Sequence, residues 1–170
     1  MEFQKVIDSR YSVRSFDSKP VEDEKIQAIL EVARVAPTAK NSQPHKIYVI
    51  KSEEALAKAR TLTTCHFDAP LIFIICGEED RACILKSNGK NFMEIDCAIV
   101  QTYMMLKATD LGLGSCWVGR INPPEVKAEF NLPENTVVYG FLVVGYPSSD
   151  CEPSPRHELR REVSEFAVEL

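Results

Sequence analysis

Two arginines and a serine alternate with other residues in residues 10–16, near the start of this 170-residue chain. In an extended segment, Arg10, Ser12 and Arg14 face the same side and span roughly 13 Å. Guanidinium groups bind phosphate and other oxyanions through paired hydrogen bonds. The row therefore fits an elongated ligand with a phosphate at one end. A solvated basic edge near a turn would give the same pattern.

A second polar segment, residues 37–44, is bracketed by Pro37 and Pro44. The amides of Asn41 and Gln43 offer both donors and acceptors, as the edge of a heterocycle requires. An ordinary connecting turn after a helix is the alternative interpretation.

A third segment, residues 112–119, holds three glycines and Trp117, the only tryptophan of the chain. Glycines allow a backbone to approach a flat ligand closely. The alternative is that Trp117 serves as a core or interface anchor.

Several common catalytic patterns are missing from the sequence. Residues 112–117 are not a dinucleotide fingerprint, because Trp117 stands at the third glycine position. The sequence has no P-loop and no G-x-S-x-G motif, and His45, His66 and His157 are isolated from one another. The six cysteines form no C-x-x-C pair. Hydrolase, kinase and metalloenzyme functions are therefore disfavoured, and we expect no metal.

Composition is that of an ordinary globular protein, with 45% hydrophobic and 26% charged residues. The length suffices for one core. The net charge of −5 argues against a nucleic-acid partner. No apolar run is long enough to span a membrane, and no signal peptide is visible. We expect a cytoplasmic protein with buried, reduced thiols.

Hydrophobic periodicity predicts alternating helices and strands, hence an α/β or α+β protein with three or four core strands. The expected helices lie near residues 3–7, over 23–35, 53–60 and 92–111, and from 123 onward. The expected strands are 46–51, 70–76, 115–118 and 136–144. The helix over 92–111 carries a stripe through Ile95, Ile99 and Tyr103, and its broad apolar surface predicts a central position.

The last segment, residues 145–170, begins with prolines and ends in a charged stretch that still carries five apolar side chains. These are Leu159, Val163, Phe166, Val168 and Leu170. A set this apolar predicts that the tail is buried against a second copy of the chain. The alternative is a terminal helix folded back onto its own subunit.

Taken in order, the polar motifs resemble those of the nitroreductase family, which are FMN-dependent flavoproteins. The resemblance covers most of the chain. The four matching motifs are Arg10-x-Ser12-x-Arg14-x-Phe16, Pro37-Thr38-Ala39-x-Asn41-Ser42-Gln43-Pro44, the run Gly-Leu-Gly-Ser-Cys-Trp at 112–117, and Gly145-Tyr146-Pro147 followed by Arg156.

The resemblance implies a central, mostly antiparallel sheet wrapped by helices. It also implies a single FMN-binding domain over residues 1–170, whose tail, 145–170, reaches across an obligate homodimer. Two FMN sites would then be built across the dimer interface.

The family's cofactor contacts, carried over to the matching positions, give a set of expected FMN-binding residues. Arg10 and Arg156 would hold the phosphate, Tyr11 and Ser12 would meet the phosphate–ribityl region, and Arg14 would lie towards the pyrimidine ring. Pro37, Thr38, Ala39 and Asn41 would come from the partner chain, with Gln43 a neighbour. Trp117 and Val118 would line the ring, with a backbone N–H of Gly119 or Arg120 near N5.

The implied activity is hydride transfer from NADH or NADPH to the flavin, followed by ping-pong reduction of nitroaromatics, quinones or activated alkenes. No side chain need act as acid or base, because the cofactor carries the chemistry. Alternatives are a non-catalytic FMN-binding or storage module, reductive dehalogenation, and flavin cleavage. His45 and Arg120 depart from the family pattern, and Lys86, Lys90 and Asn91 lie in the short segment where larger relatives carry lid helices.

Overall fold

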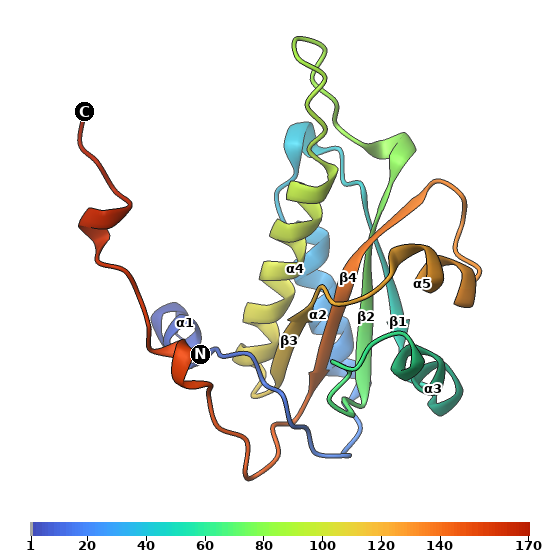
Figure 1. Cartoon of the computed structure of the whole chain (residues 1–170), viewed down its shortest axis with the longest axis vertical. Helices are drawn as coiled ribbons and strands as arrows, with labels where there is room; N and C mark the ends of the chain where they lie inside the picture. The colour runs from blue at the N-terminus through green and yellow to red at the C-terminus, as the bar shows by residue number, and fades with distance from the viewer. Residues whose placement is uncertain (1) are drawn as a thin grey trace.

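The computed structural model describes residues 2–170, and its centre is a four-stranded sheet (Figure 1). The strands are β1 (His45–Ile50), β2 (Leu71–Glu78), β3 (Gly114–Val118) and β4 (Thr136–Gly145). Their order is β1-β2-β4-β3, and each neighbouring pair is antiparallel. The prediction of a mostly antiparallel sheet is confirmed, and all four expected strands form.

The two central strands owe their place to uninterrupted apolar sequence. Residues 71–77 of β2 are all buried, as a strand covered on both faces requires. Residues 140–145 of β4 are buried in the same way. The register pairs Leu71 with Val144 and shifts at Ile75/Cys76, where the ladder has a bulge.

Helices cover both faces of the sheet. On one face lie α2 (Asp23–Val35) and α4 (Met93–Asp110), with the short α1 (Phe3–Ser9) against α4. On the other face lie α3 (Glu53–Thr61) and α5 (Pro123–Glu129). The bounds agree with the predicted helices to within two residues at the ends that periodicity defined. Each face therefore has its own buried cluster of side chains.

The inward face of α4 is not the one that the sequence stripe indicated. Met93, Val100 and Met104 are buried against the sheet, whereas Ile95 and Tyr103 are exposed. The helix is apolar around most of its circumference, so periodicity could not identify the packed side. The prediction of a central helix is half right, because α4 packs on the sheet with one apolar stripe and presents another outward.

Residues 146–170 leave the end of β4 and run away from the sheet (Figure 1). They contain only two 3-10 turns, Pro155–His157 and Val163–Glu165. All five apolar side chains near the end are exposed, Phe166 at 59%. The alternative of a terminal helix folded back onto its own subunit is wrong.

No helix within residues 2–170 is long and apolar enough to cross a membrane. Four of the six cysteines, Cys76, Cys83, Cys97 and Cys116, are buried, and all six are free thiols. Burial raises the pKa of the Cys76 and Cys97 thiols to about 12, which keeps both of them protonated and unreactive.

Candidate functional site

Residues 10–16 lie alongside β3 as an extended segment. The Val13 N–H donates to the Ser115 carbonyl at 3.0 Å, and Ser12 forms an isolated parallel bridge with Ser115. Val13 is only 1% exposed. Because side chains alternate in extended backbone, burying Val13 turns Ser12 and Arg14 to the opposite side.

The connection after β4 fixes the other edge of this segment. The Asp17 N–H donates to the Tyr146 carbonyl at 2.8 Å, and the Ser148 N–H donates to the Ser15 carbonyl at 3.1 Å. Phe16 also forms an antiparallel bridge with Pro147. Residues 10–17 are thus held between β3 and the start of the tail.

A cavity of about 650 Å³ opens beside this segment. Five of the predicted cofactor residues line it: Arg10, Tyr11, Ser12, Arg14 and Arg156. Four more lining residues were not predicted: Glu152, Ser154, His157 and Arg160. The lining holds four arginines and a single carboxylate, a strongly basic balance in a chain whose net charge is negative, and this composition suits an anion.

Tyr11 connects the segment to the tail that carries Arg156. Its hydroxyl donates to the Cys151 carbonyl at 3.3 Å, and its ring meets the His157 ring edge-on at a centroid distance of 6.4 Å. Burial raises the pKa of the Tyr11 hydroxyl, so this group remains a hydrogen-bond donor. The contacts bring two segments, distant in sequence, to one cavity.

A smaller hollow of about 170 Å³ adjoins the first at Arg14, which lines both. Trp117, Val118 and Gly119 line it as predicted, together with Cys65, Phe67, Cys116 and Arg120. A Cβ atom at Gly119 would meet no atom within 4 Å, so the backbone there is open to a flat ligand. We call these two spaces the anion cavity and the ring hollow.

Burial raises the pKa of the Cys116 thiol, and the nearby Arg14 cation opposes this shift only in part. A thiol of this kind is a packing group beside the ring hollow rather than a nucleophile.

The loop containing Pro37, Thr38, Ala39, Asn41 and Gln43 lines neither space. It follows the far end of α2, whereas residues 10–16 lie near the opposite end of that helix (Figure 1). Lys86, Lys90 and Asn91 also line neither space. Within one chain, therefore, the second motif is not brought to the first.

The same loop is nevertheless built into a specific shape. Lys40, Asn41 and Gln43 all have positive φ, a conformation that costs energy for residues other than glycine. The carboxylate of Asp96, which is 1% exposed, accepts from the Ala39 N–H at 2.8 Å. Asp96 thus holds the loop from the first turn of α4, a connection that local sequence gives no sign of.

His45 begins β1 directly after this loop. Burial lowers its pKa, against the opposing attraction of Asp96 and Glu78, and its buried Nδ1 atom has no hydrogen-bond partner. The neutral His45 ring is thus half-buried at one of the positions where the sequence departs from the family pattern.

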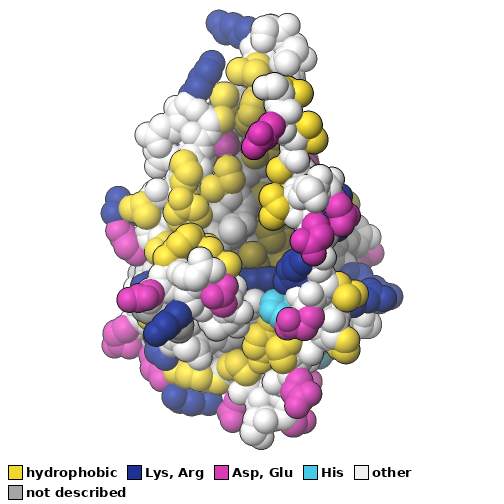
Figure 2. Space-filling view, turned by 90° about the vertical axis from the view of Figure 1, so that its left-hand side faces the viewer, with side chains coloured by type: hydrophobic (Ala, Val, Ile, Leu, Met, Phe, Trp, Pro, Cys, Tyr) yellow, Lys and Arg dark blue, Asp and Glu magenta, His cyan; other side chains and the backbone are white. Residues whose placement is uncertain are grey.

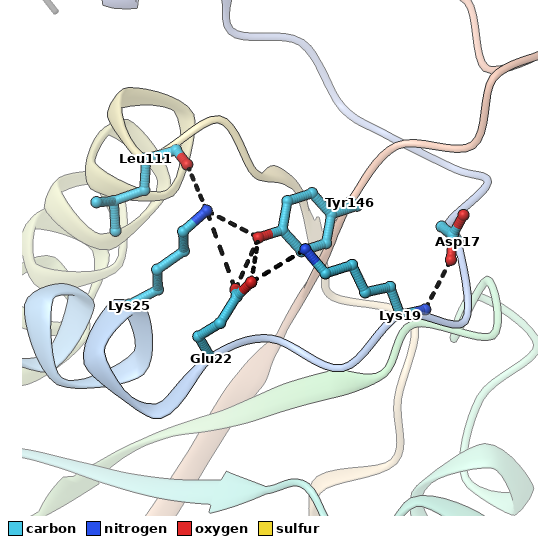
Figure 3. Close-up of polar contacts among 6 residues, drawn as sticks. All are labelled: Asp17, Lys19, Glu22, Lys25, Leu111 and Tyr146. Carbon is cyan, nitrogen blue, oxygen red and sulfur yellow. Dashed lines mark hydrogen bonds and ion pairs between the residues drawn. The ribbon is translucent and has the colours of Figure 1, made fainter.

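The end of β4 is fixed by a polar cluster (Figure 3). The Tyr146 hydroxyl donates to the Glu22 carboxylate at 2.7 Å, and Lys25 donates to the Leu111 carbonyl at 3.0 Å and to the Tyr146 hydroxyl at 2.8 Å. Lys19 pairs with Glu22 at 3.0 Å. The hydrogen bond from Tyr146 is the main reason that the pKa of Glu22 falls to about 2. The cluster joins α2, the end of α4 and the start of the tail behind residues 10–17.

The model of the nitroreductase family matches residues 7–70 and 64–146, which is most of the chain and includes the segment, the loop and the ring hollow. The chain belongs to the nitroreductase family. This nitroreductase-family chain is 30% identical over 154 residues to an Archaeoglobus fulgidus protein named NADH dehydrogenase/NAD(P)H nitroreductase, with 86% of each covered. It is 27% identical over 163 residues to a Bacillus subtilis FMN reductase that uses NAD(P)H by its name, covering 85% of this chain and 66% of that protein.

The fold of this nitroreductase-family chain has solved counterparts. The crystal structure of a nitroreductase family protein from Clostridium difficile 630 superposes with a TM-score of 0.92 at 39% identity, over 99% of this chain and 98% of the other. The likeness therefore extends through the tail.

Proposed function

We propose that this protein is an FMN-dependent oxidoreductase that takes hydride from NADH or NADPH and reduces small acceptors. The observation that carries the proposal is the position of Arg14 in the walls of both the anion cavity and the ring hollow. The two spaces together suit one elongated ligand with a phosphate at one end and a flat ring at the other. Family membership and the names of the relatives support the same assignment.

The residues present fit FMN. Arg10 and Arg156 would bind its phosphate, with Tyr11 and Ser12 beside the ribityl chain. Trp117, Val118 and the open backbone at Gly119 would face the ring. When bound, FMN accepts and releases two electrons as hydride at N5.

Arg14 contributes electrostatics rather than proton transfer. Its cation, placed towards the pyrimidine end of the ring, would stabilise negative charge on the reduced cofactor. Neither space is lined by a pair of carboxylates, and within residues 2–170 no hydrogen bond joins a lining Ser or Cys side chain to His157. This agrees with a reaction in which no side chain acts as an acid or base.

A homodimer would complete the site. The outward stripe of α4 is exposed at Ile95 and Tyr103, and the space-filling view shows hydrophobic side chains gathered around a hollow on this side of the molecule (Figure 2). One apolar hollow of about 420 Å³, lined by Phe3, Val32 and Tyr103 among others, lies between the helices. Exposed apolar area of this kind is typical of a subunit interface.

The proposed dimer also accounts for two features that a single chain leaves unused. The tail would bury its five apolar side chains on the partner, and the rigid loop at 37–43 would reach the partner's flavin. We propose that residues 1–170 form one FMN-binding domain in each subunit, with 145–170 as its exchanged tail. We further propose that it acts in the cytoplasm, without a nucleic-acid or membrane partner.

The kinetic mechanism follows from one shared space over the ring. We propose that donor and acceptor occupy it in turn, which gives ping-pong kinetics. Quinones and nitroaromatics, being flat, suit the position beside Trp117, and activated alkenes are further candidates. Initial rates at several fixed quinone concentrations should give parallel double-reciprocal lines against NADH or NADPH. Intersecting lines would contradict this mechanism, because they require donor and acceptor to be bound together.

A further inference from the structure

A second basic hollow, of about 530 Å³, lies between the end of α3 and the turn that follows β3. Its walls include Arg60, Thr64, His66 and Arg120. Arg120 also lines the ring hollow, so the two spaces adjoin at this guanidinium. Arg120 is the one lining residue that this hollow shares with the two spaces proposed for FMN.

Arg120 and Arg60 both have side-chain N–H groups without a hydrogen-bond acceptor in the described part of the chain. Within residues 2–170, the exposed Arg120 side chain has no hydrogen bond or ion pair. The Nε of Arg60 is buried without a hydrogen-bond partner. The nearest carboxylate oxygens to Arg60 belong to Glu53 at 3.6 Å and Asp68 at 3.9 Å, and both carboxylate side chains are largely exposed. Distances this long leave the donors of Arg60 to a better acceptor.

The wall that carries these groups is fixed. The Thr63 hydroxyl donates to the Arg120 carbonyl at 2.7 Å and accepts from the Cys65 N–H at 3.1 Å. His66 Nδ1 is occupied by Asp68, whose N–H donates to it at 3.0 Å and whose carboxylate oxygen lies 3.3 Å away, so Nε2 is the ring nitrogen left for a ligand. Phe67 and Asp68 both hold positive φ values, so the loop is kept in a conformation that costs energy.

We propose that this hollow binds the pyrophosphate of the nicotinamide dinucleotide donor, with Arg120 and Arg60 as its ligands. The proposal rests on the proposed function, since it takes the nicotinamide ring to lie over the ring hollow. In the dinucleotide, one ribose separates the nicotinamide ring from the pyrophosphate. The pyrophosphate would therefore enter the hollow that adjoins the ring hollow at Arg120. Paired guanidiniums and an imidazole N–H match the oxygens of a pyrophosphate. A pyrophosphate is common to NADH and NADPH, so both donors would be accepted.

The test uses the FMN-loaded protein and the variants Arg60→Gln and Arg120→Gln. ADP-ribose, which carries the pyrophosphate but no nicotinamide, is the binding probe, measured by calorimetry. The second donor is 1-benzyl-1,4-dihydronicotinamide, which has the reactive ring but no phosphate. Arg81→Gln, which removes an exposed guanidinium that lines neither this hollow nor the spaces proposed for FMN, is the control. Because Arg60 is partly buried, Arg60→Lys is made alongside it.

Each charge-removing variant should weaken ADP-ribose binding and raise the KM for NADH by about ten- to hundredfold, the range for a lost charged hydrogen bond. In Arg60→Gln, whose residue lines neither of the spaces proposed for FMN, reduction by the benzyl donor and the FMN affinity should stay at wild-type values. Unchanged ADP-ribose affinity in both variants would overturn the inference. Equal losses with NADH and the benzyl donor in Arg60→Gln would also overturn it, since Arg60 would then act at the ring. Failure of the wild-type protein to bind FMN would instead remove the proposed function.

Discussion

Val13 packs so closely against Gly114 that a Cβ atom at position 114 would lie 2.5 Å from Val13 Cγ2. No real Cβ makes a contact that short, so the segment that carries Arg10, Ser12 and Arg14 can lie on β3 only because residue 114 is glycine. The glycine identified in the sequence for its approach to a ligand thus has a different role. It admits the segment that we propose binds FMN, rather than FMN itself.

Gly114→Ala should therefore displace residues 10–16. We expect a loss of about 1–3 kcal/mol in unfolding free energy, as for overpacking of a core site, together with weaker FMN binding. Denaturant unfolding and FMN titration measure the two effects. Gly119→Ala is the control: nothing lies within 4 Å of its added Cβ, so its stability should be unchanged while its FMN affinity falls. Equal stability of Gly114→Ala and wild type would show that the segment is not held by this contact.

Arg10→Ala should weaken FMN binding by about 1.5–3 kcal/mol, because a charged hydrogen bond to the phosphate is lost. Fluorescence titration of FMN measures the change, and Arg34→Ala, at an exposed position paired with Glu31, serves as a charge-matched control. An FMN affinity equal to that of wild type would remove Arg10 from the phosphate site.

Arg14→Ala should slow the reduction of the flavin more than it weakens FMN binding. If its cation stabilises the reduced cofactor, the rate of reduction by NADH falls by about tenfold to a thousandfold, while FMN binding changes less. Stopped-flow measurement of flavin bleaching gives the rate directly. A variant that loses FMN but is reduced at the normal rate when saturated would place Arg14 at the phosphate instead.

Deleting residues 157–170 should cost both the dimer and the cofactor. The deletion removes five exposed apolar side chains and Arg160, which lines the anion cavity. Sedimentation equilibrium and the visible spectrum measure the two losses together. A truncated protein that stays dimeric and yellow would exclude the exchanged tail.

The polar cluster at Tyr146 predicts a specific pH dependence. The hydrogen bond from Tyr146 holds the pKa of Glu22 at about 2, below its ordinary value of 4.5. A lowered pKa in the folded state contributes stability above pH 4.5, and this contribution is lost as the pH falls from 4.5 to about 2. Tyr146→Phe keeps the ring under Lys19 but removes this hydroxyl.

The melting temperature of wild type should accordingly exceed that of Tyr146→Phe at neutral pH. The difference should narrow as the pH is lowered through the range between the two pKa values. Thermal melts at a series of pH values provide the comparison. If the difference in melting temperature stays constant down to about pH 2, the Glu22 carboxylate is not stabilised by the tyrosine hydroxyl.

The sequence predicted the elements well because each carries a local signal. The continuous apolar run at 70–76 indicated a buried strand. Pro37 marked the end of the helix over 23–35. The prediction that Arg10, Ser12 and Arg14 share one side of the segment is also confirmed, since it depends only on extended backbone. These three residues do line one cavity with Arg156.

The remaining features depend on contacts between distant segments. Asp96 holds the loop at Ala39 from another helix, and Arg160 reaches the anion cavity only through the path of the tail. The packed side of α4 could not be read from a helix that is apolar on several sides. The positive φ values at Lys40 and Gln43 could not be predicted either, since neither residue favours this conformation on its own.

The most direct test of the proposed function is the visible spectrum of the purified protein in the absence of air. We expect a yellow protein with non-covalent FMN, whose flavin absorbance is bleached on addition of NADH or NADPH and returns when a quinone is added. A protein that retains FMN but is bleached by neither nucleotide would contradict the NAD(P)H oxidoreductase and favour a binding module or another donor. A colourless protein that refuses added FMN would contradict the account as a whole.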